Sequence, residues 1–262
     1  MKFYRFGKYM WEASKWLPGI QLYTVKEDFE SNPFRTLERV AEIGYKTIEF
    51  AGYGGIPAME MKKKLDQLGL IAVATHVGIE DLDTSLKKHL EYASTIGIRF
   101  IVVPYIPKET LSDPVKYSAL IDALRRIYEE LRKKGFQLAL HTHGHWFETI
   151  NGKQMYLDRL LEDLGFKLPL EIDTYWVKKG GSDPETILLK YAGHVPLVHL
   201  KDMDQHGKTT AVGSGIINFR KIISQFKEVG FQFYFVEQED FETIPFNDIR
   251  KSLLYLKSIG AA

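Results

Sequence analysis

The sequence contains no cysteine, and this absence excludes disulfide bonds and thiolate metal sites. It also has no surplus of either charge, because 35 Lys and Arg residues stand against 34 Asp and Glu residues. Such a chain has no broad positive field that would attract a nucleic-acid backbone. Any bound metal must therefore use oxygen and imidazole ligands, and we expect no nucleic-acid partner.

Long apolar runs are missing as well. No run approaches the roughly 18 apolar residues of a membrane span, and charged side chains interrupt residues 1–18 before an apolar stretch of export-signal length develops. We therefore expect a cytoplasmic protein without a membrane partner. We interpret residues 1–18 as an N-terminal extension that covers the bottom of the fold or contributes to a homo-oligomer contact.

From Gly19 onward, short runs of β-branched and aromatic residues alternate with longer segments of helical periodicity. This alternation is typical of parallel strands joined by helices. Pairs such as Asn32-Pro33 indicate helix starts, and glycines such as Gly44 follow helix ends. The predicted strands span residues 19–24, 47–50, 71–76, 100–105, 137–143, 169–173, 195–200 and 232–237, and the predicted helices span residues 33–43, 58–68, 86–96, 114–134, 154–164, 184–191, 219–229 and 245–259.

Eight repeats of strand and helix predict a (β/α)8 TIM barrel, and such barrels commonly occupy about 250 residues as one unit. We therefore expect a single catalytic domain over residues 19–262. The alternative is an open doubly wound sheet, which usually has a glycine-rich phosphate-binding turn after its first strand. The corresponding segment here, residues 23–28, reads YTVKED, and this favours the barrel.

Polar residues collect at the carboxyl ends of the predicted strands, where the active sites of such barrels lie. Isolated structural residues have no reason to fall at corresponding ends of so many strands. Side chains two residues apart on a strand share a face, so the paired positions can point into one barrel mouth. The strand-end residues are Gln21, Tyr23, Glu49, His76, His141, His143, Asp173, His199, Lys201 and Glu237.

Carboxylates and imidazoles together favour Mn²⁺, Mg²⁺, Co²⁺ or Fe²⁺ over a closed structural zinc site. We expect one divalent ion per chain, with Mn²⁺ as the first choice and Zn²⁺ as a further alternative. The segment HTHGH, residues 141–145, has a separate interpretation as a zinc site of two or three imidazoles. We favour a role for these histidines in contacting the substrate or in supporting the metal ligands.

Several segments, in order along the chain, resemble the xylose isomerase-like sugar phosphate isomerase/epimerase superfamily. The resemblance extends from about Gly19 to Gly260 and implies a metal-dependent TIM-barrel enzyme. The segments are GIQLYTV (19–25), IEFAGYGG (48–55), THVG (75–78), EIDTYWV (171–177), GGSDP (180–184), VHLKD (198–202), VGSGIINF (212–219) and VEQE (236–239).

The resemblance implies four metal ligands: a Glu after the fifth strand, an Asp ending the sixth, a His on the seventh and a Glu ending the eighth. Asp173, His199 and Glu237 match the last three. Members often read His-Asn-His-x-x-Glu at the first place, and residues 143–148 fit this spacing. The first ligand is thereby identified as Glu148.

Two features complicate the match with the family. An alignment counted from Gly135 puts Trp146, which cannot ligate a metal, at the place of the first ligand. Glu148-Thr149, however, resembles a Glu-Thr pair of inosose dehydratase-like members, and we therefore keep Glu148. Ser214 stands where relatives commonly have Glu, and Asn218 where they often have Asp, so substrate contacts from that loop differ from the family pattern.

The chemistry that the resemblance implies is proton transfer next to a carbonyl through a metal-stabilised enediolate of a sugar, keto-sugar or cyclitol. In the epimerases two ligating glutamates act on opposite faces of one carbon, and here these are Glu148 and Glu237. The residues expected to bind or enclose the substrate are Gln21, Tyr23, Glu49, His76, Tyr105, His143, His145, Trp176 and Lys201.

Three alternatives remain open at this point. The first is an inosose dehydratase-like lyase, which keeps the metal and the proton abstraction but expels a hydroxyl group. The second is an abasic-site endonuclease on the same fold, which the near-neutral charge disfavours. The third is a non-catalytic sugar-binding barrel.

Overall fold

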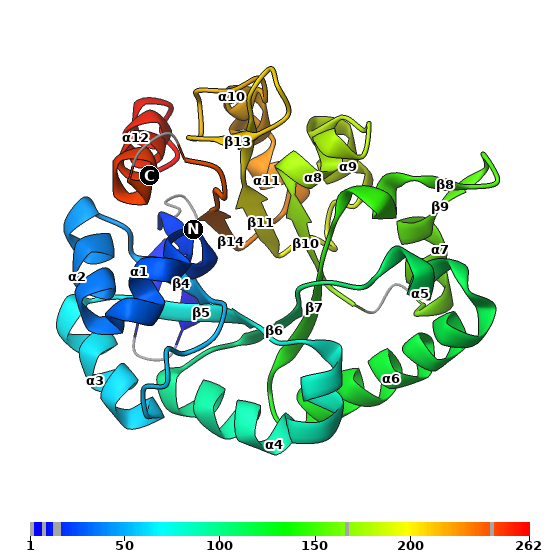
Figure 1. The fold of residues 1–262 in the computed structure, drawn as a ribbon, viewed down its shortest axis with the longest axis horizontal. Helices are drawn as coiled ribbons and strands as arrows, with labels where there is room; N and C mark the ends of the chain where they lie inside the picture. The colour runs from blue at the N-terminus through cyan, green and yellow to red at the C-terminus, as the bar shows by residue number, and fades with distance from the viewer. Residues whose placement is uncertain (1–2, 7–8, 13–16, 166–167, 242–243) are drawn as a thin grey trace.

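Eight parallel strands close into a barrel with the helices around it (Figure 1). The computed structural model describes residues 3–6, 9–12, 17–165, 168–241 and 244–262, with side chains from residue 17 onward. The pairing of β7 with β10 completes the ring, which excludes the open sheet and confirms the predicted fold. The strands, in chain order, are β3 (Gly19–Gln21), β4 (Thr47–Phe50), β5 (Ile71–His76), β6 (Phe100–Val103), β7 (Gln137–His141), β10 (Leu170–Asp173), β11 (Leu197–Leu200) and β14 (Phe233–Val236).

The main helices lie outside the barrel and begin at signals that the sequence carries. The side chains of Asn32, Asp113 and Asp183 accept backbone N–H groups of the following helical turn, and proline follows each of them. These helices are α2 (Pro33–Ile43), α3 (Ala58–Leu68), α4 (Ile79–Ile96), α6 (Pro114–Lys133), α7 (Tyr156–Asp163), α9 (Pro184–Lys190), α10 (Phe219–Ser224), α11 (Phe226–Val229) and α12 (Pro245–Ser258).

The structure differs from the prediction mainly in short elements. Helix α4 begins at Ile79 instead of residue 86, and Ser85 has a non-helical backbone that divides it. The predicted helix 219–229 is divided at Gln225 into α10 and α11. Elements of one or two turns leave too short a periodic pattern to detect. They are η1 (Leu22–Val25), α1 (Lys26–Ser31), α5 (Lys108–Ser112), η2 (Gly144–Phe147) and α8 (Thr174–Lys179).

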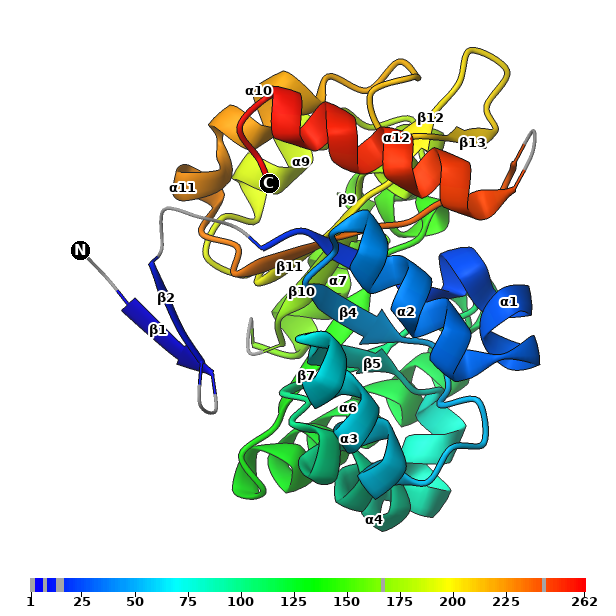
Figure 2. The same cartoon turned by 90° about the vertical axis from the view of Figure 1, so that its left-hand side faces the viewer.

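In the part of the chain that the structure describes, three pairs of antiparallel strands lie outside the barrel sheet. Strands β8 (Thr149–Ile150) and β9 (Gln154–Met155) form one, and β12 (Asp202–Met203) and β13 (Thr209–Thr210) form another. The third belongs to the N-terminal extension, where β1 (Phe3–Phe6) pairs with β2 (Tyr9–Glu12) (Figure 2). Its role in covering the barrel or in an oligomer stays a prediction. Among the described helices, none combines the length and the apolar character that crossing a bilayer would need.

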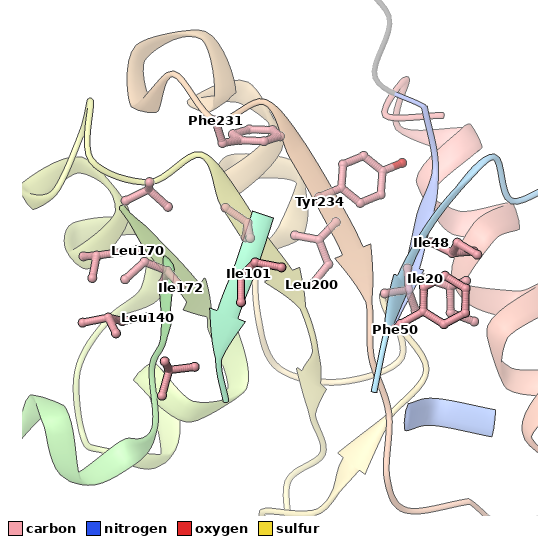
Figure 3. Close-up of a cluster of buried hydrophobic side chains, with 14 of the residues drawn as sticks. Ile20, Ile48, Phe50, Ile101, Leu140, Leu170, Ile172, Leu200, Phe231 and Tyr234 are labelled. Atoms are coloured by element: carbon pink, nitrogen blue, oxygen red, sulfur yellow. The ribbon is translucent and has the colours of Figure 1, made fainter. Parts of the chain in front are cut away.

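Side chains along each barrel strand alternate between two cores, as the period of a strand requires. Ile48 and Phe50 of β4 pack outward against the helices (Figure 3), while Glu49 between them belongs to the opposite face and is fully buried. The inner core is apolar below the site. It consists of Val73, Ala74, Phe100, Val102, Ala139, Leu197, Phe233 and Phe235. Above this layer, the inward positions become polar.

Candidate active site

Buried acids and histidines occupy the inward positions at the carboxyl ends of six barrel strands. Because residues two apart share a face, Glu171 and Asp173 both belong to the inner face of β10. In the register of the sheet, Glu171 lies opposite His141 of β7, and Asp173 lies opposite His199 of β11. The strand register thus brings these side chains together inside the barrel mouth.

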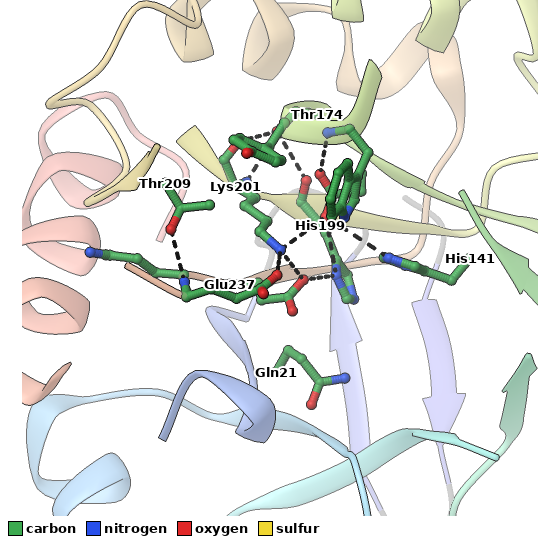
Figure 4. Close-up of polar contacts among 12 residues, drawn as sticks. Gln21, His141, Thr174, His199, Lys201, Thr209 and Glu237 are labelled. Atoms are coloured by element: carbon green, nitrogen blue, oxygen red, sulfur yellow. Dashed lines mark hydrogen bonds and ion pairs between the residues drawn. The ribbon is translucent and has the colours of Figure 1, made fainter. Parts of the chain in front are cut away.

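One cluster of four residues can hold a metal ion, and we call it the mouth group: His141, Asp173, His199 and Glu237. One ligand atom of each lies within 4.8 Å of the others. Nδ1 of His199 lies 2.7 Å from Oε2 of Glu237 and 3.8 Å from Oδ2 of Asp173. Figure 4 shows the side chains of His141, His199 and Glu237 close to one another. Two carboxylates and two imidazoles suit a divalent transition metal.

A second cluster, the inner group, consists of His76, His141, Glu171 and His199. Oε2 of Glu171 lies 2.9 Å from Nε2 of His76, 3.0 Å from Nδ1 of His141 and 3.2 Å from Nε2 of His199. The two shared imidazoles therefore present one nitrogen to each group.

This sharing limits how the two groups can be used. An ion bound through Nδ1 of His199 and Nε2 of His141 leaves the other ring nitrogens protonated and able to donate to the inner carboxylates. Glu171 then supports both rings. Glu49 supports His199 as well, since its Oε2 lies 2.6 Å from Nε2 of that ring and also accepts a hydrogen bond from Gln21. The two clusters together could hold one ion together with the residues that support its ligands.

Neighbouring carboxylates raise the pKa of two of the histidines in the site. Burial lowers the pKa of His199, but the carboxylates of Glu171, Glu49 and Glu237 outweigh this effect and raise the pKa well above its usual value. The same competition, with burial opposed by Glu49 and Glu171, raises the pKa of His76 to about 10. These two imidazoles therefore hold their protons strongly, whereas burial lowers the pKa of His141 to about 4.

Asp173 has the atom that best fits a metal. Its Oδ1 caps helix α8 by accepting the backbone N–H of Trp176 at 2.9 Å, while its Oδ2 is buried without a hydrogen-bond partner. Burial, with Glu237 nearby, raises the pKa of Asp173 to about 7. A buried carboxylate oxygen without a donor is costly unless a cation compensates it.

Lys201 supplies a fixed positive charge beside the mouth group. Its Nζ lies 3.5 Å from Glu237 and 4.0 Å from Asp173, and it also pairs with Glu239. Burial lowers the pKa of Lys201, but the carboxylates have the larger effect. The pKa of Lys201 therefore lies above its usual value. An ammonium held in this way stays protonated and can stabilise negative charge on a bound molecule.

A hollow of about 400 Å³, which we call the mouth hollow, opens above the mouth group. Such a volume lies in the range of small-molecule sites. His143 borders it, and burial lowers the pKa of that imidazole to about 2, which keeps the ring neutral. The hollow is lined by Tyr23, Ala51, His76, Pro104, Tyr105, His141, His143, Trp176, Lys201, Glu237 and Glu239.

The loops after β7 and β10 are in direct backbone contact at one wall of this site. A Cβ atom added to Gly180 would lie 2.4 Å from the carbonyl oxygen of Gly144, far closer than atoms can approach. Gly144 follows His143 in the chain, and Gly180 follows helix α8, whose N-terminus Asp173 caps. This contact sets the spacing between the two loops.

The family model described as "Xylose isomerase-like TIM barrel" matches residues 37–259, which include all four residues of the mouth group. The chain belongs to the xylose isomerase-like TIM barrel family. An inosose dehydratase of Geobacillus kaustophilus (strain HTA426) is 23% identical over 248 residues, covering 79% of this chain and 79% of the relative. This family membership confirms the resemblance detected in the sequence.

Similar solved structures extend the comparison. A sugar phosphate isomerase/epimerase from Parabacteroides distasonis ATCC 8503 has a TM-score of 0.79 at 25% identity, covering 94% of this chain and 95% of that one. An L-ribulose 3-epimerase has a TM-score of 0.69 at 15% identity, covering 93% and 94%, a likeness of fold alone. The chain is thus similar in sequence to a dehydratase and in structure to a sugar phosphate isomerase/epimerase.

The structure brings most of the predicted substrate residues to the mouth hollow, but three lie elsewhere. Gln21 and Glu49 are fully buried and bonded to each other beneath it. His145 is outside the lining because its Nε2 bonds to the carbonyl of Ile106 at 2.9 Å. The predicted residues that line the hollow are Tyr23, His76, Tyr105, His143, Trp176 and Lys201.

Glu148, the first predicted ligand, lies outside the mouth group. The segment after His143 continues as helix η2, which carries Glu148 to the rim, where it pairs with Lys108 of α5. Its side chain is 45% exposed there. In the structure His141 takes the fourth place in the group, and the role of Glu148 as ligand stays a prediction.

Two residues of the site were missing from the predicted set. Glu171 precedes Asp173 by two positions, so the alternation of the strand could have identified it. Glu239 follows Glu237 by two positions and forms an ion pair with Lys201 over the hollow. It lies beyond the end of β14, where alternation gives no guide.

Proposed function

We propose that this chain is a divalent-metal-dependent enzyme that moves a proton next to the carbonyl of a sugar, keto-sugar or cyclitol, acting as an isomerase or epimerase. The observation that carries the proposal is the convergence of His141, Asp173, His199 and Glu237 at the mouth of the barrel. The inosose dehydratase relatives and the similar sugar phosphate isomerase/epimerase structure give further support, since the family resemblance implies the same first proton transfer for both kinds of enzyme.

Asp173, His199 and Glu237 would hold the ion, with His141 as the fourth ligand in the present geometry. A divalent cation at this place, Mn²⁺ by preference, would polarise the substrate carbonyl and make the neighbouring C–H bond more acidic. The two imidazoles would bind it in a fixed orientation because Glu49 and Glu171 accept hydrogen bonds on their far sides.

Glu237 is the base that we assign to the first proton transfer. It borders the mouth hollow, so its carboxylate can face a substrate carbon. Burial raises the pKa of Glu237, but the nearby charges of Lys201 and His199 have the larger effect. The pKa of Glu237 therefore lies well below its usual range. The carboxylate is therefore ionised and can accept a proton, and Lys201 can stabilise charge on the substrate oxygen.

Epimerisation needs a second acid or base on the opposite face, and Glu148 is the residue proposed for this role. To act there, its carboxylate must leave Lys108 and turn toward the hollow. An ion pair between side chains as exposed as these contributes about 0–1 kcal/mol, so its loss would cost little.

Dehydration is the second candidate, and the inosose dehydratase relatives favour it. Incubation of the Mn²⁺-loaded protein with ketoses and inososes in D₂O tests both reactions. Exchange of the α-proton supports the shared first step. Mass spectrometry then distinguishes them, because isomerisation conserves mass and dehydration loses water.

The control is Glu237→Gln, which removes the base but keeps an oxygen ligand. We expect exchange in this variant to fall by at least ~100-fold. Exchange that is equal in both proteins, or absent from the loaded wild type with every substrate of the panel, would contradict the proposal.

A further inference from the structure

The mouth hollow has a neighbour of nearly equal size. A second hollow, of about 390 Å³, lies between the start of α1, the segment after β14 and the start of α12, and we call it the side hollow. Each volume lies near the lower end of the range for small-molecule sites. The side hollow is lined by Tyr23, Thr24, Val25, Lys26, Glu27, Asp28, Gln238, Glu239, Phe241, Ile244 and Pro245.

Tyr23 and Glu239 line both hollows, so the two spaces adjoin at these side chains. Tyr23 is 39% exposed, and its hydroxyl accepts a hydrogen bond from Lys26 at 3.1 Å. Thr209 fixes the backbone of Glu239, since its Oγ1 accepts the Glu239 N–H at 3.0 Å. A molecule held over the mouth group can therefore extend past the side chains of Tyr23 and Glu239 into the side hollow.

The charges around the two hollows are unfavourable for a phosphate. Lysines 26 and 201 are the cationic residues with permanent charge in the two linings, and neither lining contains an arginine. Lys201 is 1% exposed and already faces three carboxylates. The hydrogen bond to Tyr23 is the main cause of the raised pKa of Lys26, and the negative charges of Glu239 and Glu27 raise this pKa as well.

The helix that borders the side hollow also disfavours an anion. Phosphates bind at helix N-termini where free amides and the helix dipole attract negative charge. The first turn of α1 instead carries Glu27 and Asp28, both of which line the hollow. The apolar faces of Tyr23, Phe241 and Pro245 supply contact area for an uncharged ring.

We propose that the substrate of this site carries no phosphate and is larger than one sugar ring: its reacting ring lies over the mouth group, and a second, uncharged hydroxylated ring occupies the side hollow. The proposal rests on the proposed function for the placement of the reacting ring. It assigns Tyr23 and Glu239 to the passage between the rings.

Calorimetric binding to the Mn²⁺-loaded protein tests this substrate class. The probes are D-fructose, fructose 6-phosphate and the ketose disaccharides turanose, maltulose and isomaltulose, which differ in the hydroxyl that carries the second ring. We expect at least one disaccharide to bind about tenfold or more tightly than D-fructose, and fructose 6-phosphate to bind no more tightly than D-fructose.

A pair of variants on α1 locates the second ring. Glu27→Trp adds bulk to the lining of the side hollow, whereas Glu30→Trp adds the same bulk to an exposed position of α1 outside it. We expect Glu27→Trp to abolish the preference for the disaccharide and to leave D-fructose binding unchanged. Glu30→Trp should behave as the wild type.

Three results would overturn the proposal: no disaccharide that binds more tightly than D-fructose, a preference for fructose 6-phosphate, or a disaccharide preference that survives Glu27→Trp. The failure of the proposed function would look different. In that case the protein would exchange no α-proton in any ketose or inosose, whatever the binding preference.

Discussion

Nε2 of His199 and Oε2 of Glu49 lie 2.6 Å apart although 150 residues separate them in the sequence. Both side chains are fully buried. Glu49 can hold the proton of His199 on Nε2, which leaves Nδ1 with a free lone pair beside Asp173 and Glu237. The orientation of the His199 ring, a proposed metal ligand, is thus set by a carboxylate on a different strand of the barrel.

Glu49→Gln should weaken metal binding by about 10–100-fold, the usual effect of removing a supporting carboxylate. The variant keeps an acceptor but loses the charge that fixes the tautomer. Competition with a chelator measures the affinity, and Glu91→Gln, at an exposed position of α4, is the control. Equal affinity in both variants would exclude a supporting role for Glu49.

Asp173→Asn should lose the metal while the barrel stays folded, because it removes the charge of the unpartnered oxygen. Lys201→Met should retain the metal, since a protonated ammonium has no lone pair to donate and repels a cation. Elemental analysis after reconstitution with Mn²⁺ checks both. Metal retained by Asp173→Asn would remove this residue from the ligand set.

Glu148→Gln should lower turnover by at least ~100-fold if the carboxylate is the second acid or base. Lys108→Met is the matched control, because it breaks the same ion pair and leaves Glu148 intact. We expect the lysine variant to keep its activity. If both variants have wild-type activity, Glu148 serves only at the rim, and His143 becomes the residue to test.

Asp202→Asn should destabilise the protein by about 2–4 kcal/mol, because several hydrogen bonds to a buried charged group are weakened together. The Asp202 carboxylate accepts the backbone N–H groups of Met203, Gly213, Gly215 and Ile217. Asp204→Asn, which affects a similar but exposed turn, should cost less than about 1 kcal/mol. Urea unfolding measures both, and equal losses would contradict this account.

The barrel could be predicted from the sequence because its signals are local. Asn32, Asp113 and Asp183 cap helices next to proline, and strand segments have β-branched and aromatic composition. The closing of the sheet followed from the number of repeats. These features depend on neighbouring residues and need no knowledge of distant contacts.

The site could be predicted only in part, because its geometry depends on loops and on register. Asp173 and His199 lie at or near the ends of regular strands and Glu237 follows one directly, so alternation could place them on the inner face. Glu148 follows a loop whose path is set by helix η2, and spacing alone does not determine that path. The role of His141 depends on its register against Glu171, which is a relationship between two strands.

The backbone contact between Gly144 and Gly180 bears on how loops can be exchanged within this family. Barrel enzymes tolerate variation in the loops at the carboxyl ends of their strands, which suggests that single loops could be transplanted from one relative to another. Here the backbones of the loops after β7 and β10 are in direct contact. A chimera whose loop after β10 carries a side chain at the position of Gly180 would push the two loops apart, whereas a transplant of both loops from one relative would keep two loops that already fit each other.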